Sequence, residues 1–311
     1  MTVNKHCGEF HGLPVLDFSG EADEARAWPA PGAAAWRLAV RYGASTGFDG
    51  LWKAFLDTVD PAGVRALLVG PWWTRDYDSV GATLATILRD ADRLPALEAL
   101  FLADVTYDEC EISWLEMSDV TAVPAAFPHL TELVVRGGNG LALTPFRHDR
   151  LKALRFETGG LPGTVVRAVA GSELPALERL ELWLGVDEYG GDSTIDDLTP
   201  FLDGARFPAL RHLGLQNSEY QDEIAAAVAH APVVARLESL DLSMGVLTDE
   251  GATALLEGQP LTHLRALDLH HHYLTDELQQ RLRDALPGVA VDLSDAEDED
   301  DPEDRYVAVA E

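Results

Sequence analysis

The sequence predicts an α/β solenoid, in which short parallel strands line a concave face and helices cover the convex face. Two observations predict it. The apolar pattern L-x-x-L-x-L, with Val or Phe at some places, occurs eight times between residues 64 and 269, at intervals of 21 to 33 residues. Segments with helical spacing of apolar residues separate the copies. Because one strand and one helix cannot bury their apolar faces alone, the units must stack on one another.

Each copy of the pattern predicts one short strand, since its second and third apolar positions alternate and therefore point to one face. An incomplete copy of the pattern, WRLAV, begins at Trp36, and a degenerate copy, GVAVDL, begins at Gly288. The repeats therefore extend over residues 36–293. The eight clear copies predict parallel strands in one curved sheet over residues 67–69, 100–102, 133–135, 154–156, 180–182, 213–215, 240–242 and 267–269.

The segments between the later copies carry signals for helices. Leu278, Leu282 and Leu286 stand at i, i+4 and i+8, so they share one helical face. Thr248 and Thr275 are each followed by Asp-Glu, which suits an N-cap threonine and negative charge in the first turn of a helix. We expect a helix to start at each threonine.

The two ends of the chain do not follow the repeat. Residues 1–35 are expected to form a cap over the apolar edge of the first unit. Residues 294–311 begin with SDAEDEDDPEDR, a composition that cannot form a core. We expect them to be a disordered acidic tail.

The repeats resemble leucine-rich repeats, and the longer units with an L-T-D-E helix start resemble the ribonuclease-inhibitor-like class. That class often has Asn or Cys three places after the last strand leucine. Those places hold instead Trp72, Val105, Gly138, Gly185, Ser218, Gly245 and His272, so irregular turns are expected. FHGLPVLDF, AWRLAVRY and FLDTVDPAGVRALLVG are also similar to an uncharacterised bacterial family of cytoplasmic leucine-rich repeat proteins, which implies a fold and no particular activity.

Composition and charge narrow the classes of partner. The net charge of −30 opposes binding to nucleic-acid phosphates and anionic lipids, and it favours a basic protein. No apolar run approaches the roughly 20 residues that span a bilayer. Cys7 and Cys110 are too few for a disulfide framework, and the first residues contain no apolar signal core. A cytoplasmic location is therefore expected.

Three consecutive histidines, His270, His271 and His272, follow the last clear strand pattern and raise the question of a metal site. Asp268, two residues before His270, is a candidate co-ligand. Neighbouring side chains in a turn diverge, however, so all three rings do not readily converge on one ion. A histidine-rich turn is therefore favoured over a metal site.

Two further motifs also have simpler interpretations. GASTG at residues 43–47 fits the G-x-S-x-G pattern of a serine nucleophile, but no repeat register brings a histidine to Ser45, so a glycine-rich turn is favoured. His6, Cys7 and His11 match no standard zinc spacing. The sequence contains no phosphate-binding loop, no H-E-x-x-H and no paired C-x-x-C. We expect no metal, no cofactor and no catalytic residue.

The strand positions that face the concave side predict a partner-binding surface. Leu68, Phe101 and Val134 stand side by side, about 4.8 Å apart across the sheet, with Trp72 just beyond, and such an exposed apolar row marks an interaction patch. The alternative is that the cap or a loop folds over this row. The predicted binding residues further along are Arg155, Glu157, Glu181, Trp183, Gln216, Asp241, Asp268 and His270. Carboxylates steer a basic partner, and aromatic residues are common binding hot spots.

The sequence thus predicts a non-enzymatic protein that binds a partner protein through its concave strand face. Two other functions stay open. One is a regulator of an enzyme, of the nuclease-inhibitor or GTPase-activating type, and co-purification with a nuclease or a small GTPase favours it. The other, less favoured, is a serine hydrolase whose esterase activity disappears in Ser45→Ala.

Overall fold

We describe a computed structural model of the chain, over residues 3–18, 28–298 and 304–311. Its strands are β1 (Glu9–Phe10), β2 (Leu13–Phe18), β3 (Ala35–Leu38), β4 (Ala66–Val69), β5 (Ala99–Leu102), β6 (Glu132–Arg136), β7 (Ala153–Glu157), β8 (Arg179–Gly185), β9 (His212–Ser218), β10 (Ser239–Asp241), β11 (Ala266–Asp268) and β12 (Ala290–Asp292). Its α-helices are α1 (Phe48–Thr58), α2 (Gly81–Arg89), α3 (Ala122–Ala126), α4 (Gly163–Gly171), α5 (Ile195–Leu202), α6 (Gln221–Val228), α7 (Asp249–Glu257) and α8 (Asp276–Ala285).

The twelve strands of the described residues form one sheet in chain order. Neighbouring strands run parallel, except that β1 is antiparallel to β2. Equivalent leucines of successive repeats are register partners, as Leu213, Leu240 and Leu267 show, and all three are buried. The predicted leucine-rich repeat solenoid is confirmed, and each predicted strand is present, although β10 and β11 end one residue earlier than expected.

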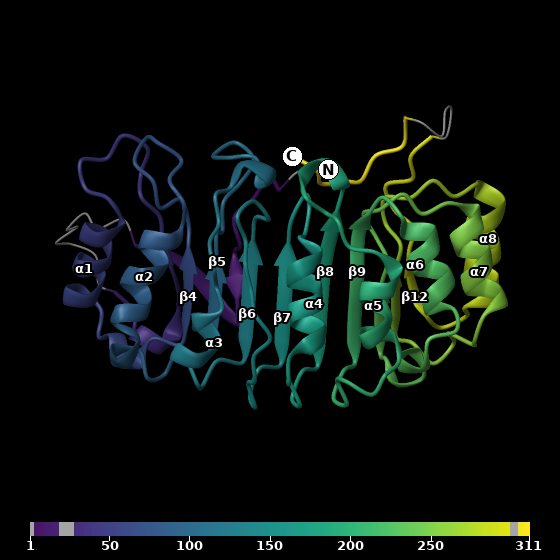
Figure 1. Cartoon of the computed structure of the whole chain (residues 1–311), viewed down its shortest axis with the longest axis horizontal. Coiled ribbons are helices and arrows are strands. Elements are labelled where there is room, and N and C mark those ends of the chain that lie inside the picture. The colour runs from purple at the N-terminus through teal and green to yellow at the C-terminus, as the bar shows by residue number, and fades with distance from the viewer. Residues whose placement is uncertain (1–2, 19–27, 299–303) are drawn as a thin grey trace.

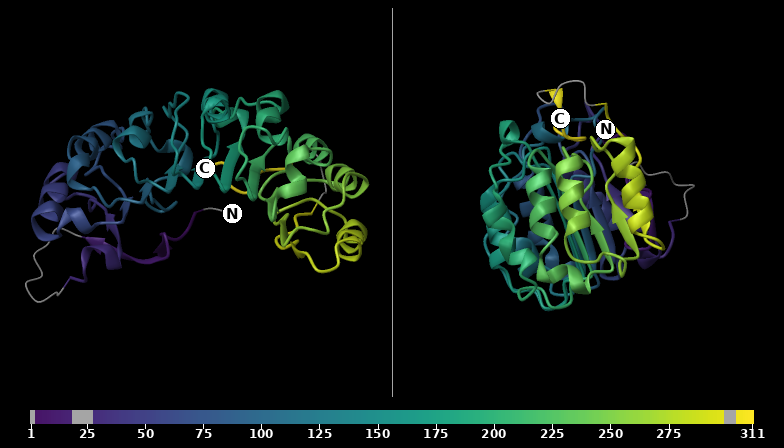
Figure 2. Two further views of the ribbon diagram at one scale, coloured as in Figure 1. Left: turned by 90° about the horizontal axis from the view of Figure 1, so that it is seen from below. Right: turned by 90° about the vertical axis from the view of Figure 1, so that its right-hand side faces the viewer.

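The sheet lines the inside of an arc, and the helices cover its outside (Figure 1) (Figure 2). The threonine before α7 accepts a hydrogen bond from the backbone N–H of Glu250, and the threonine before α8 accepts one from that of Leu278. Both predicted N-caps, Thr248 and Thr275, are therefore confirmed. Residues 137–152 between β6 and β7 form no α-helix, because the shortest repeat interval leaves no room for one.

The amino-terminal residues extend the sheet and then turn back over it. β2 pairs in parallel with β3 and so becomes the edge strand next to the first repeat. β1 precedes β2 in the chain, and a tight turn at His11 and Gly12, both with positive φ, joins these two antiparallel strands. The segment before β1 then crosses the concave side (Figure 2). Residues 1–2 and 19–27 of the predicted cap lie outside the described residues.

The carboxyl-terminal residues also pack against the sheet, along the edge where the parallel strands end. We call residues 306–311 the edge strap. The N–H of Ala308 donates to the carbonyl of Met244 at 2.8 Å, and the N–H of Val309 donates to the side chain of Asn217 at 2.9 Å. The carbonyl of Ala310 accepts a hydrogen bond from the hydroxyl of Ser113.

The expectation of a disordered tail is wrong for the edge strap. Val307, Ala308 and Val309 are buried, because this short apolar stretch covers the loops that follow the strands. Residues 299–303 of the predicted tail lie outside the described residues. None of the helices in the described part of the chain has the length and apolar character that a bilayer crossing requires.

Candidate functional site

The apolar row of the concave face is covered. Leu68, Phe101 and Val134 are buried, with exposed fractions of 0, 1 and 2%. Phe10 of the amino-terminal hairpin packs on them, and its ring centroid lies 5.9 Å from that of Phe101. The prediction that this row binds a partner is wrong, because covering it with the chain's own hairpin removes the cost of exposing apolar surface.

Trp72 is not a binding residue at the surface either. Its ring is buried and meets the ring of Trp73 edge-on, at 4.9 Å between centroids. Its indole N–H donates to the carbonyl of Asp78 at 2.6 Å. Trp72 therefore anchors the loop after β4, and its prediction as a contact residue is wrong.

Alternating charges cross the concave face from β6 to β9, and we call them the charge ladder. Arg136 Nε donates to Glu157 at 2.7 Å, and Arg155 Nε lies 3.0 Å from the other oxygen of Glu157. Arg155 also lies 3.5 Å from Glu181, and His212 Nε2 lies 3.1 Å from Glu181. The predicted role of Glu157 and Glu181 as free steering carboxylates is wrong, since both are buried and paired.

Two buried carboxylates of this face have opposite electrostatic environments. Burial raises the pKa of Glu181, but the imidazole of His212 at 3.1 Å and the charge of Arg155 outweigh it and hold the pKa at about 2. Burial, followed by the charge of Asp268, raises the pKa of Asp241 to about 6. The two carboxylates are separated by a single strand, β9.

The strand-end aspartates Asp241, Asp268 and Asp292 are register partners on β10, β11 and β12. Each carboxylate accepts a hydrogen bond from the backbone N–H two residues later, at 2.9 to 3.1 Å. A side chain that binds its own backbone in this way starts a turn. This explains why β10 and β11 end at the aspartates.

The concave surface of β7 to β11 remains accessible, and we call it the open face. Its partly exposed members among the predicted binding residues are Arg155, Trp183, Asp268 and His270. The side chains of Arg155 and Asp268 are each 34% exposed. Gln216 and Asp241 are buried and bonded to each other, Nε2 to Oδ2, at 2.9 Å. They support the open face from below rather than form its surface.

The three histidines of the last strand turn serve different partners. His270 Nδ1 lies 2.8 Å from Asp268, and this hydrogen bond raises the pKa of His270. Burial lowers the pKa values of His271 and His272. His271 Nε2 lies 3.0 Å from the carbonyl of Tyr306 in the edge strap, and His272 Nδ1 accepts from the backbone N–H two residues later. The described residues contain no group of three side chains placed to hold a metal ion.

The residues of the other two sequence motifs do not come together into a site either. Ser45 is exposed in the turn before α1, and within residues 3–18, 28–298 and 304–311 no hydrogen bond joins it to a histidine. His6 Nδ1 lies 2.9 Å from Arg37, whereas His11 Nδ1 lies 3.0 Å from Glu132. The amino-terminal histidines therefore bind to different strands of the sheet.

Exposed aromatic side chains at the sheet edge are a feature that the sequence analysis missed. Tyr42, Tyr77, Tyr107 and Trp114 are exposed, and they lie in the loops that follow β3, β4 and β5. In a parallel sheet these loops meet at one edge. The available signal was that all four aromatics occur in the segments between a strand and the next α-helix, outside the repeat pattern.

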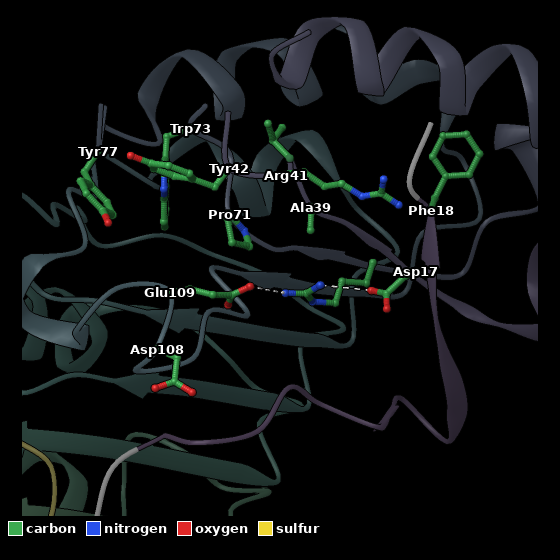
Figure 3. Close-up of a pocket in the computed structure, with 12 residues that line it drawn as sticks. Asp17, Phe18, Ala39, Arg41, Tyr42, Pro71, Trp73, Tyr77, Asp108 and Glu109 are labelled. Atoms are coloured by element: carbon green, nitrogen blue, oxygen red, sulfur yellow. Dashed lines mark hydrogen bonds and ion pairs between the residues drawn. The ribbon is translucent and has the colours of Figure 1, made fainter. Parts of the chain in front are cut away.

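Two adjoining cavities lie among these loops. The first has a volume of about 490 Å³, and Tyr42, Trp73 and Tyr77 gather on one side of it (Figure 3). Arg37 lies between Asp17, at 3.1 Å, and Glu109, at 3.8 Å.

The second cavity, which we call the edge pocket, has a volume of about 530 Å³. The side chains around it include three aromatics and four acids: Tyr77, Tyr107, Trp114, Asp108, Glu109, Glu111 and Glu116. The edge pocket and the first cavity share Tyr77, Asp108 and Glu109.

The stacked units, the parallel concave sheet and the outer helices define a leucine-rich repeat protein. The chain is similar to a Bacteroides fragilis protein whose crystal structure was determined as a structural-genomics target, with 30% sequence identity and a TM-score of 0.78. The match covers 86% of this chain and 76% of the other. This chain belongs to the family of that Bacteroides fragilis protein.

Two more distant solved structures also match. A leucine-rich repeat protein of Leptospira interrogans is 13% identical, with 85% of this chain and 56% of that chain covered and a TM-score of 0.39. TLR13 in a complex with ssRNA13 is 19% identical, with 85% and 39% covered and a TM-score of 0.34. No family model and no curated protein matches the chain.

Proposed function

We propose that this protein is a non-enzymatic module that binds a partner protein through its open face. The observation that carries the proposal is the division of the concave surface. The chain's own hairpin covers the apolar row on β4 to β6, whereas β7 to β11 present Trp183 among fixed polar groups. An aromatic side chain on a rigid, partly exposed surface is a typical binding hot spot.

The open face is organised before any partner arrives. Trp183 follows Glu181 on β8, and Glu181 is held by the charge ladder. Asp268 and His270 are bonded to each other at the other end of the open face. Because these side chains are already ordered, little conformational entropy is lost when a partner binds.

The chemistry of the open face favours a basic partner. Asp268 lies at its far end, between the register partners Asp241, which is buried, and Asp292 on β12, and the whole chain carries a net charge of −30. Such a field attracts a basic protein and repels nucleic acid and anionic lipid.

We also propose that the repeats belong to the ribonuclease-inhibitor-like class, because α4 to α8 alternate with strands. We propose a cytoplasmic location, because Cys7 and Cys110 are unpaired thiols.

The test uses the purified chain to capture and identify partners from an extract of the source organism, followed by titration calorimetry with a recombinant partner. Trp183→Ala should weaken binding by about 2 kcal/mol or more, which is roughly 30-fold in Kd, whereas Trp183→Phe should retain most of the affinity. Asp268→Lys should slow association and reduce its dependence on salt. Glu257→Lys makes the same charge change at the end of α7 on the convex side and serves as its control.

The proposal fails if a combined Trp183→Ala, Asp268→Asn variant keeps its circular dichroism and binds the identified partner with unchanged Kd. Asp241 is left out of this variant because it is buried, and its replacement alters the stability of the fold.

A further inference from the structure

We infer that the edge pocket is a second binding site, which takes the cationic side chain of an arginine or lysine from a basic protein segment. This site is distinct from the open face, and its test does not depend on the proposed function.

The walls of the edge pocket are aromatic. Tyr77, Tyr107 and Trp114 are 51, 38 and 63% exposed, and all three line the same cavity. Single exposed aromatics are common on protein surfaces, but several around one cavity form an apolar patch that marks an interaction site. The faces of tyrosine and tryptophan rings attract guanidinium and ammonium groups.

The charge of the edge pocket selects a cation. Asp108, Glu109, Glu111 and Glu116 line it, and no lysine or arginine does. Among the described residues, nothing donates a hydrogen bond to the carboxylates of Asp108 and Glu111. Burial, followed by the charge of Glu111, raises the pKa of Cys110 to about 11, so this thiol stays uncharged and leaves the negative charge to the carboxylates.

The pocket does not have the arrangement of a metal site. Within the described residues, no three carboxylate, imidazole or thiol groups are placed to hold an ion. Together with the three aromatic walls, this favours an organic cation over a metal cation.

The loops that carry these side chains are fixed. The N–H groups of Glu109 and Cys110 both donate to the carbonyl of Thr106 at 3.0 Å, and the carboxylate of Glu109 accepts from the N–H of Thr106 at 2.9 Å. Trp114 ends a short 3-10 turn whose first residue, Ile112, is buried in the core. A site that is rigid before binding loses little entropy when the ligand enters.

The neighbouring cavity indicates a segment rather than a free small cation. The two cavities share Tyr77, Asp108 and Glu109, and Tyr77 contacts Trp73 at 5.2 Å between ring centroids. A chain of several residues can therefore place a cationic side chain in the edge pocket and extend past Tyr77 towards Tyr42.

The experiment measures binding of a short glycine-rich peptide with two arginines by titration calorimetry at about 0.15 M salt, where the Debye length is about 8 Å. Trp114→Leu should weaken binding about tenfold, because it removes the aromatic face and leaves every charge in place. Trp114→Phe should stay within about threefold of the parent chain. Tyr306→Leu removes an exposed aromatic ring that lines neither of the two cavities, so it should have no effect.

Four outcomes overturn the inference. Equal binding by the parent chain and Trp114→Leu means that the net negative charge alone attracts the peptide. Equal binding of a citrulline peptide means that no cation is recognised. A loss in Tyr306→Leu as large as that in Trp114→Leu places the peptide elsewhere. Tetramethylammonium that binds more tightly than the peptide, with the same dependence on Trp114, identifies a free small cation as the ligand.

Discussion

The two halves of the concave face are built from the same repeat but end as different surfaces. On β4 to β6 the outward strand positions are apolar, and the amino-terminal hairpin covers them with Phe10. On β7 to β11 the equivalent positions carry charges that pair within the sheet and leave Trp183 partly exposed. The repeat therefore sets the position of each side chain, whereas segments outside the repeat decide which positions a partner can reach.

The largest expected difference between the halves concerns their aromatic side chains. Phe101→Ala should lower the free energy of unfolding by about 3 to 5 kcal/mol, because it leaves a cavity under Phe10 and removes the ring below the guanidinium of Arg136. Trp183→Ala on the open face should cost less than about 1.5 kcal/mol, since its ring is already partly in water. Urea titration of both variants measures the contrast, and equal losses would show that the hairpin does not cover the row in solution.

The second expected difference concerns pH and the two buried carboxylates of the open half. The pKa of Glu181 lies below its ordinary value of 4.5, so Glu181 stabilises the fold above about pH 4.5, and this stability is lost as the pH falls towards 2. The pKa of Asp241 lies above its ordinary value of 3.8, so its contribution is largest at low pH and is lost as the pH rises through about 6. Their replacements should therefore act in opposite directions.

At pH 7, Glu181→Gln should cost about 3 kcal/mol and Asp241→Asn should gain about 3 kcal/mol, because the two shifts are similar in size and opposite in sign. In Asp241→Asn the carbonyl oxygen of Gln216, which has no partner in the described residues, gains a donor when the amide of Gln216 turns over. Urea titrations from pH 4 to pH 8 measure both effects, and the gain from Asp241→Asn should disappear at pH 4. A loss of stability from Asp241→Asn at pH 7 would contradict the raised pKa.

The smallest expected effect concerns the edge strap. The strap is bonded to the loops of the open half, as the hairpin is packed on the covered half. Asn217 has a positive φ of 57°, and its buried amide bonds to both the N–H and the carbonyl of Val309. Asn217→Gly keeps this backbone conformation accessible and removes the hydrogen bonds, so it should cost about 2 kcal/mol in urea titration. Asp295→Gly, at an exposed position with a positive φ of 55°, is the control and should cost less than about 0.5 kcal/mol.

Most of the fold follows from one periodic signal. Buried leucines such as Leu213 and Leu240 recur with a register that only stacked parallel strands satisfy, and this signal was sufficient to locate β4 to β11. The turn-forming bonds of Asp241 and Asp268 end two strands one residue earlier than the leucine spacing predicts.

The candidate surfaces were less predictable because they depend on contacts between distant segments. The arginines that neutralise Glu157 and Glu181 stand on the same strand face, so their pairing was visible in principle once the register was known. The alternative that the cap folds over the apolar row is the one the structure has, but the contact of Phe10 with Phe101 was not visible, since residues 3–18 carry no repeat. The acidic residues before them hid Val307 to Val309, although the continuous apolar stretch YVAVA at residues 306–310 was the available signal.

The edge strap also changes how this solenoid is expected to unfold. In most repeat proteins each unit touches only its neighbours, so stability is a sum of nearest-neighbour terms and terminal units fray independently. Here Ser113 and Ala310, which are 197 positions apart in sequence, share a hydrogen bond, and the strap spans the units between them. The final repeats cannot fray without releasing the strap from the middle of the arc. The chain is therefore expected to melt as one cooperative unit, and closure of this long loop is expected to be the slow, late step of its folding.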